Sequence, residues 1–192
     1  IFQYEASKPN AASCSAGSAT YGGGGVLQSK ACSKSGVLPW TNVSWTEARQ
    51  ACQNLGAGWD LCSAAQWQAI CATASGYSFP YGDTYQGTYC NGNEYDTNCP
   101  CGTGGGCTTT GDQDEIINTG SRPSCTSVWG GVSVYDMSGN VKEWTSTASG
   151  SYYEIRGGAS NNLKDGLTCQ FDFTTAPDYF TFFNIGFRCC HP

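Results

Sequence analysis

The stretch that decides the fold is Val134-Tyr135-Asp136-Met137-Ser138-Gly139-Asn140-Val141-Lys142-Glu143-Trp144. Its centre, Ser138-Gly139-Asn140, has the composition of a tight turn, because Gly and Asn tolerate the backbone conformations that turns require. Around this bend the sequence offers the several oxygen ligands that calcium takes, namely the carboxylates of Asp136 and Glu143 and the carbonyls of Gly139 and Val141. The stretch therefore predicts a structural calcium loop. The alternative is that both carboxylates only cap backbone amides.

The composition indicates one domain with few charges. The chain has 192 residues, only 12% of them charged, and its net charge is −6. This length fits a single domain over residues 1–192. The acidic balance and the lack of a basic run make nucleic acid an unsuitable partner. No apolar run approaches the roughly 18 residues of a membrane span.

The cysteine content indicates an oxidising compartment. The chain has 13 cysteines at irregular spacings and a single histidine, His191, which does not match the paired spacing of zinc ligands. Such a count is typical of a disulfide-rich secreted, extracellular or cell-surface protein. Because the count is odd, one thiol is either free or bonded to another chain. Proximity suggests the pair Cys14–Cys32.

Two capping boxes predict two short helices. Ser44-Trp45-Thr46-Glu47 begins the first, in which apolar residues recur on one face until Gly56. Ser63-Ala64-Ala65-Gln66 begins the second, which runs to Ser75-Gly76. Each helix directs one cysteine inward, Cys52 and Cys71.

Residues 76–133 show almost no periodicity, so disulfides or a bound ion must order them. The acidic residues near the end of this segment suggest a second calcium site, formed by Asn91, Asn93, Asp112 and Asp114. The alternative is a solvated acidic loop.

Further on, residues 152–156 predict a strand, and the aromatic segment 167–190 predicts two strands around a turn at Pro177-Asp178. Strands, two helices and long loops together indicate an α+β domain.

The ordered motifs resemble the formylglycine-generating enzyme (sulfatase-modifying factor) family. They cover nearly the whole chain and comprise Tyr4-Glu5-Ala6-Ser7, Ser44-Trp45-Thr46-Glu47-Ala48, Leu61-Cys62-Ser63-Ala64-Ala65-Gln66-Trp67, Phe79-Pro80-Tyr81-Gly82, Val134–Trp144, Ile155-Arg156-Gly157-Gly158 and Ile185-Gly186-Phe187-Arg188-Cys189-Cys190. The resemblance implies a C-type-lectin-like fold with small twisted antiparallel sheets, two short helices and long disulfide-stapled loops. It also implies the calcium loop at Asp136, Gly139, Val141 and Glu143.

The resemblance also suggests how the cysteines pair. In this family the first-helix cysteine usually pairs with the one after Gly-Phe-Arg, which implies Cys52–Cys189. The second-helix cysteine usually pairs with one beyond Arg-Gly-Gly, which implies Cys71–Cys169. The family pattern does not supply Cys90–Cys125 and Cys62–Cys190, which are two further pairs that we expect.

The chain departs from the family at its catalytic centre. The enzymes of the family hold copper with two cysteines shortly after Arg-Gly-Gly, whereas residues 159–167 contain no cysteine. Copper(I) needs soft thiolate ligands, which Asn and Ser do not replace. We therefore expect no copper and no enzyme activity, and an active copper-dependent oxidase is only a remote alternative.

The remaining signals favour an extracellular binding or adhesion domain with a protein or glycan ligand. In related non-enzymatic members the segment between Arg-Gly-Gly and Gly-Phe-Arg presents the ligand face, which here implies Ser160, Asn161, Asn162, Asp172, Phe173, Tyr179, Phe180, Phe182 and Phe183. Exposed members of this set would form an apolar partner surface. The alternative is a structural subunit of an extracellular fibre or surface assembly that self-associates. The tryptophans at 40, 45, 59, 67, 129 and 144 are either core residues or the lining of a sugar site.

Overall fold

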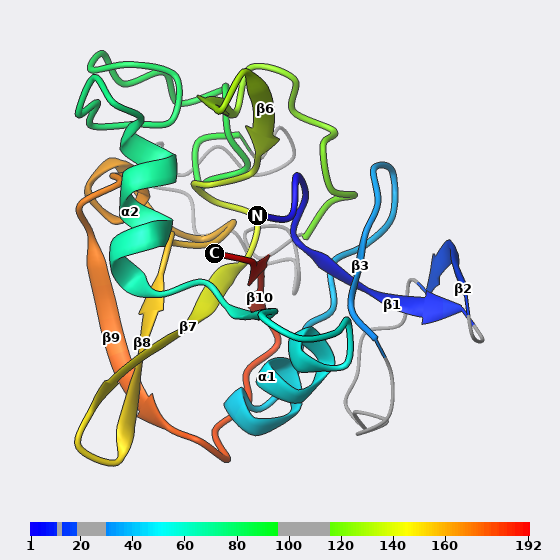
Figure 1. Cartoon of the computed structure of the whole chain (residues 1–192). Helices are drawn as coiled ribbons and strands as arrows, with labels where there is room; N and C mark the ends of the chain where they lie inside the picture. The colour runs from blue at the N-terminus through cyan, green and yellow to red at the C-terminus, as the bar shows by residue number, and fades with distance from the viewer. Residues whose placement is uncertain (11–12, 19–29, 96–115) are drawn as a thin grey trace, which may run out of the picture.

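The computed structural model describes residues 1–10, 13–18, 30–95 and 116–192 (Figure 1). Two helices lie among short strands and long loops in these ranges. The elements are, in order, β1 (Ala6–Asn10), β2 (Ser13–Ser18), β3 (Cys32–Ser33), α1 (Trp45–Gln53), β4 (Asp60–Leu61), α2 (Ala64–Ala72), β5 (Thr126–Trp129), β6 (Val132–Tyr135), β7 (Lys142–Ser149), β8 (Tyr152–Arg156), a 3-10 helix (Lys164–Leu167), β9 (Asp172–Pro177), β10 (Ile185–Phe187) and β11 (Cys189–Cys190). No helix among the described residues has the length and apolar character that crossing a bilayer requires.

Both helices begin with the predicted capping boxes. At α1 the Glu47 amide donates to the Ser44 hydroxyl, and the Glu47 carboxylate accepts from the Ser44 amide at 2.9 Å. Ser63 and Gln66 make the same reciprocal pair at α2. These bonds satisfy backbone donors that a helix start leaves without partners. Local sequence alone therefore places both helix starts.

The main sheet has the strand order β10-β7-β8-β9. β7, β8 and β9 are antiparallel neighbours, whereas β10 is parallel to β7. The two strands predicted on either side of Pro177-Asp178 are present as β9 and β10, but they do not pair with each other, since β10 crosses to the far edge of the sheet. All three β10 residues are buried, and such a continuous apolar strand is typical of a position covered on both faces. Gly186 is required there, because a Cβ would lie 3.0 Å from the Trp40 carbonyl oxygen.

The remaining sheets are small. They are the sheet β2-β1-β3, the pair β11-β4 and the hairpin β5-β6. The hairpin turns at Gly130-Gly131, whose φ angles of 57° and 80° only glycine adopts freely. This hairpin was not among the predicted elements, although a Gly-Gly pair between apolar residues is a recognised hairpin signal.

The core consists of two hydrophobic clusters. One joins α1 to the main sheet and the other surrounds α2. Four tryptophans are buried in them: Trp40, Trp45, Trp67 and Trp144. For these four the core interpretation holds, whereas Trp129 remains 42% exposed.

Four disulfides hold the clusters together, and each is one of the pairs expected from the sequence. They are Cys52–Cys189, Cys62–Cys190, Cys71–Cys169 and Cys90–Cys125. The first two close loops of more than a hundred residues, with sequence separations of 137 and 128. Cross-links over such loops stabilise by about 4–5 kcal/mol in the chain-entropy model. The fifth expected pair, Cys14–Cys32, involves the side chain of Cys14, which lies outside the described residues.

Candidate functional site

The predicted calcium loop lies around the buried guanidinium of Arg188, which is located between β10 and β11. Arg188 forms an ion pair with Glu143 on β7, with Nη2 3.0 Å from Oε1, and both side chains are fully buried. It also donates to the carbonyl oxygens of Phe2, at 3.1 Å, and Tyr135, at 2.8 Å. One side chain thus joins the N-terminal segment, the end of β6, β7 and the C-terminal strands.

The second helix contacts the same carboxylate. Trp67 of α2 donates its indole N–H to Glu143 Oε2 at 2.8 Å. Glu143 therefore accepts from an indole and a guanidinium at once. Because a buried charge is costly without partners, this arrangement fixes α2 and Arg188 relative to β7.

The two carboxylates predicted to bind calcium are, as they lie, already engaged by protein partners. Both oxygens of Glu143 are hydrogen-bonded, and the guanidinium beside them would repel a cation. Asp136 accepts the Gly120 amide at 2.6 Å, and its own backbone carbonyl faces Arg188. Among the described residues no group of three or more His, Cys, Asp or Glu side chains is placed to hold a metal ion. Calcium at this loop stays a prediction that would require Glu143 to leave Arg188.

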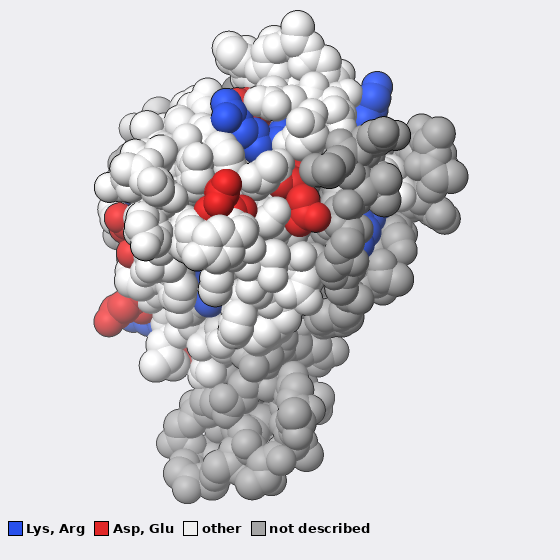
Figure 2. Space-filling model, turned by 90° about the horizontal axis from the view of Figure 1, so that it is seen from below, with Lys and Arg blue, Asp and Glu red and all other residues white. Residues whose placement is uncertain are grey.

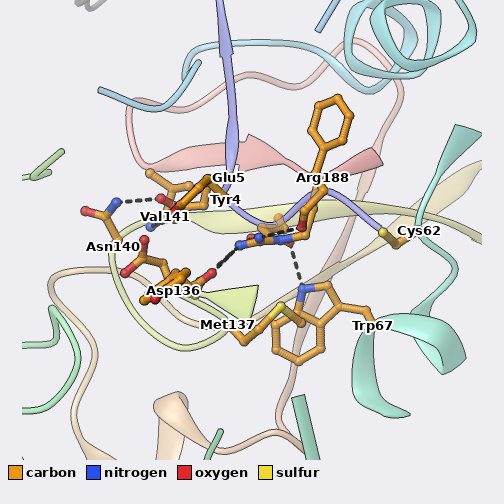
Figure 3. A network of polar contacts seen from close by, with 12 residues as sticks. Tyr4, Glu5, Cys62, Trp67, Asp136, Met137, Asn140, Val141 and Arg188 are labelled. Atoms are coloured by element: carbon orange, nitrogen blue, oxygen red, sulfur yellow. Dashed lines mark hydrogen bonds and ion pairs between the residues drawn. The ribbon is translucent and has the colours of Figure 1, made fainter. Parts of the chain in front are cut away.

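A second buried carboxylate, Glu5, holds the turn itself. It accepts from the Asn140 side chain at 2.6 Å and from the Val141 amide at 3.1 Å (Figure 3). Asn140 in turn accepts from the Ile117 amide and from the side chain of Asn91. Sequence analysis used Glu5 only as part of a family motif, since no local pattern links it to residues so distant in the chain.

Burial raises the pKa of these acids. Desolvation, together with the negative charges of Asp136 and Glu143, raises the pKa of Glu5 well above its ordinary value. Desolvation also raises the pKa of Asp136 to about 6, although the Gly120 amide and Arg188 oppose the shift. Three carboxylates therefore share one guanidinium, and the folded state favours protonation of Glu5 and Asp136.

The second predicted calcium site is only partly within the described chain. Asn91 and Asn93 are both buried, and Asn91 binds Asn140 as stated above. The amide of Asn93 donates to the carbonyl oxygen of Asn162 at 3.0 Å. Asp112 and Asp114 lie outside the described residues. The two asparagines thus connect the 89–95 segment to the loops after β6 and β8.

The predicted ligand face is exposed at its aromatic end. Tyr179 is 78% exposed, Phe182 43% and Phe180 37%, and the Phe180 and Phe182 rings are stacked with their centroids 6.3 Å apart. These rings lie on the connection between β9 and β10, at the lower end of the molecule in Figure 1. Figure 2 views the molecule from that end, and the described surface is mostly uncharged, with Lys, Arg, Asp and Glu side chains of both signs scattered over it.

A chain of contacts anchors this face to β7. The Lys142 ammonium lies 4.0 Å from the centre of the Phe173 ring and 3.4 Å from Asn184 Oδ1. Asn184 is buried and donates to Asn161 Oδ1 at 3.3 Å. The structure therefore brings Phe173 and Asn161 together through Lys142 and Asn184, two residues that sequence analysis did not assign to the face.

One member of the predicted face is buried and another is half-buried. Ser160 is buried, and the half-buried Asn162 accepts the Ala159 amide at 2.8 Å to close a turn. The exposed part of the set is therefore Asn161, Asp172, Tyr179, Phe180 and Phe182, whereas Phe173 and Phe183 are half-buried. Asp172 lies at the exposed start of the edge strand β9.

The chain belongs to the sulfatase-modifying factor enzyme 1-like domain family, whose match extends over residues 11–191. This finding agrees with the fold and with the ordered motifs on which the resemblance depends. None of the curated proteins compared with the chain matches it.

Solved structures show the same fold at low sequence identity. The chain is similar to variable protein 1 of Treponema denticola, with a TM-score of 0.58, 17% identity, 91% of this chain covered and 77% of that one. It is also similar to CarF, with a TM-score of 0.53, 19% identity, and coverage of 81% and 67%. The fold is therefore the predicted C-type-lectin-like α+β fold of the formylglycine-generating type.

Removing the charge of Glu143 should destabilise the protein. We expect Glu143→Gln to lower the free energy of unfolding by about 3 kcal/mol, because the buried guanidinium loses its counter-charge. Urea denaturation measures this loss. The matched control is Asp60→Asn, which breaks the exposed Arg49–Asp60 pair and should cost less than about 1 kcal/mol. Equal losses in both variants would contradict the central role of Arg188.

Stability should increase in mild acid. Asp136 has a pKa of about 6 in the folded state, above its pKa of about 3.9 in the unfolded chain. Protonation of Asp136 therefore stabilises the folded state. This stabilisation is complete below about pH 3.9 and is lost as the pH rises through about 6. We expect calorimetry in EDTA to show a higher melting temperature at about pH 5 than at about pH 7.5. Asp136→Asn keeps an oxygen for Gly120 and tolerates the φ of 56°, so its pH dependence should be weaker. An unchanged pH dependence would remove Asp136 from this explanation.

Chelation should leave the melting temperature unchanged. Arg188 already neutralises the carboxylate that a calcium ion would need, so we expect identical thermal unfolding curves in EDTA and in excess calcium. A lower melting temperature in EDTA, restored by calcium, would show that Glu143 leaves Arg188 to bind the ion.

Proposed function

We propose that the protein is a non-catalytic extracellular binding domain whose ligand face consists of Tyr179, Phe180, Phe182, Phe173 and Asn161. The ligand is an extracellular protein. The observation that carries the proposal is the exposure of several large aromatic rings on one connection of the chain. Clustered exposed aromatic side chains on a sparsely charged surface are typical of partner surfaces.

The anchoring of this face supports recognition by a rigid surface. Phe182 accepts the Asn42 amide through its carbonyl oxygen, and Asn184 accepts the Lys142 amide. These two bonds hold the C-terminal end of the connection, and the pairing of Pro177 in β9 with Tyr152 in β8 holds its N-terminal end. A preorganised face loses less conformational entropy on binding than a mobile loop does.

The chemistry of the segment after Arg156 supports a role without catalysis. The first cysteine beyond Arg156 is Cys169, and its sulfur is bonded to Cys71. Residues 159–167 supply Asn, Ser, Lys and Asp side chains where the copper-binding pair of the family's oxidases would lie. Soft thiolate ligands for copper(I) are therefore missing from that segment.

The disulfides support an extracellular location. Four buried pairs hold the two helices, the 89–95 segment and the C-terminal strands. Disulfides of this density form and persist in oxidising compartments. The proposal requires no metal ion, since Arg188 supplies the positive charge at the loop before β7.

Peptide selection provides a direct test. We expect a displayed peptide library panned on the purified protein to yield ligands that bind Tyr179→Ser/Phe182→Ser roughly tenfold more weakly or worse, because exposed aromatics carry most of the binding energy at such faces. Binding is measured by calorimetry with the selected peptides. Val132→Ser is the matched control, because Val132 is 55% exposed and lies on the β5-β6 hairpin.

Two results would contradict the proposal. Equal peptide affinity of the wild type and the double variant would show that the aromatic face does not bind the ligand. Aldehyde formation from a cysteine-containing sulfatase peptide in the presence of copper would show that the protein is an enzyme. Concentration-dependent assembly that the double variant abolishes would instead support the structural-subunit alternative.

A further inference from the structure

A pocket of about 470 Å³ lies beyond the C-terminal end of α2, between that helix and β5. Its lining includes Thr73, Ser75, Tyr77, Tyr81, Thr126 and Val128. In Figure 1 the end of α2 and β6 lie at the top, whereas the connection between β9 and β10 lies at the bottom. The pocket is therefore separate from the aromatic ligand face, and its volume is within the usual range of ligand sites.

One wall of the pocket is preorganised. The Tyr81 ring stacks on the buried Phe79 ring, with centroids 5.6 Å apart and planes inclined by 8°. The Tyr81 hydroxyl accepts the Gln86 amide at 3.2 Å, and Phe79 and Gly82 exchange two backbone hydrogen bonds. Tyr81 therefore presents its ring and hydroxyl in a fixed position.

Another part of the lining contains a strained residue. Thr73 has φ 57° and ψ −178°, a combination that is unfavourable for a β-branched side chain. Hydrogen bonds hold it there, since its hydroxyl accepts the Ser75 amide and its carbonyl accepts the Gly76 amide, each at 3.2 Å. Strain of this kind persists mainly at binding and catalytic sites. No contact described above for the fold or for the ligand face requires it.

The lining is uncharged and rich in hydroxyl groups. No Lys, Arg, Asp or Glu among the described residues lines the pocket, while Thr73, Ser75, Thr126 and the tyrosines supply hydroxyls. A charged ligand would lose its hydration without gaining a counter-charge. A sugar ring has an apolar C–H face that packs on an aromatic ring and hydroxyls that exchange hydrogen bonds with hydroxyl side chains. The tyrosine rings of the lining suit the apolar face of a sugar, and its hydroxyl side chains suit the sugar hydroxyls.

We propose that this pocket binds a neutral saccharide, with Tyr81 and Tyr77 as the packing surface and Thr73, Ser75 and Thr126 as hydrogen-bonding groups. The site is independent of the protein-binding face at Tyr179–Phe183. The domain then has two separate binding surfaces at opposite ends.

A glycan array with neutral, sialylated and sulfated oligosaccharides tests the proposal, followed by calorimetry with the best neutral ligand. Val128→Arg places a bulky cation at the rim of the pocket and should weaken binding roughly tenfold or more. Val132→Arg is the matched control, because Val132 lies on the same hairpin and is 55% exposed against 58% for Val128. We expect Val132→Arg to bind like wild type and the amide resonances of Thr73, Ser75 and Tyr77 to shift on saccharide addition.

Several outcomes would overturn the assignment. They are the absence of neutral-saccharide binding, a preference for sialylated or sulfated glycans, equal loss in the two arginine variants, and resonance shifts confined to residues 179–183. The Tyr179→Ser/Phe182→Ser variant distinguishes the two surfaces, since it should keep saccharide binding while losing peptide binding.

Discussion

The buried ion pair between Arg188 and Glu143 is the interaction on which the rest of the structure depends. Arg188 comes from the C-terminal strands and Glu143 from β7, and Trp67 of α2 completes the partners of the carboxylate. The guanidinium also reaches the carbonyls of Phe2 and Tyr135. The C-terminal strands, α2, the N-terminal segment and the end of β6 are thus connected by one planar group with five donors, a geometry that lysine would not reproduce.

Sequence patterns located the local elements and missed the distant partners. The capping boxes at Ser44 and Ser63 placed both helix starts, because every bond in a capping box joins residues three apart. The loop before β7 was also found, but the guanidinium beside its carboxylate was not. Nothing near Glu143 in the sequence shows that its positive partner is a side chain 45 residues later, and Glu5 is separated from Val141 by 136 residues. Such contacts are properties of the fold and not of any window of sequence.

The ligand face illustrates the same division. Composition identified an aromatic segment, and the family resemblance placed it between the Arg-Gly-Gly and Gly-Phe-Arg motifs. Which rings are exposed depends on the crossing of the chain from β9 to β10, since β10 pairs with β7 at the opposite edge of the sheet. A simple hairpin at Pro177 would have placed these side chains differently. Asn184 and Lys142 contact residues of the face, Asn161 and Phe173, because that crossing brings them side by side.

The adjacent cysteines Cys189 and Cys190 have a consequence for biosynthesis. They receive the sulfurs of Cys52 and Cys62, and Arg188 precedes them directly. All three connections therefore wait until the chain has been synthesised as far as Arg188, Cys189 and Cys190. Until then Cys52 and Cys62 are thiols without their partners, open to exchange with oxidoreductases and with each other. The order of translation thus makes the last strand the step that locks the whole domain.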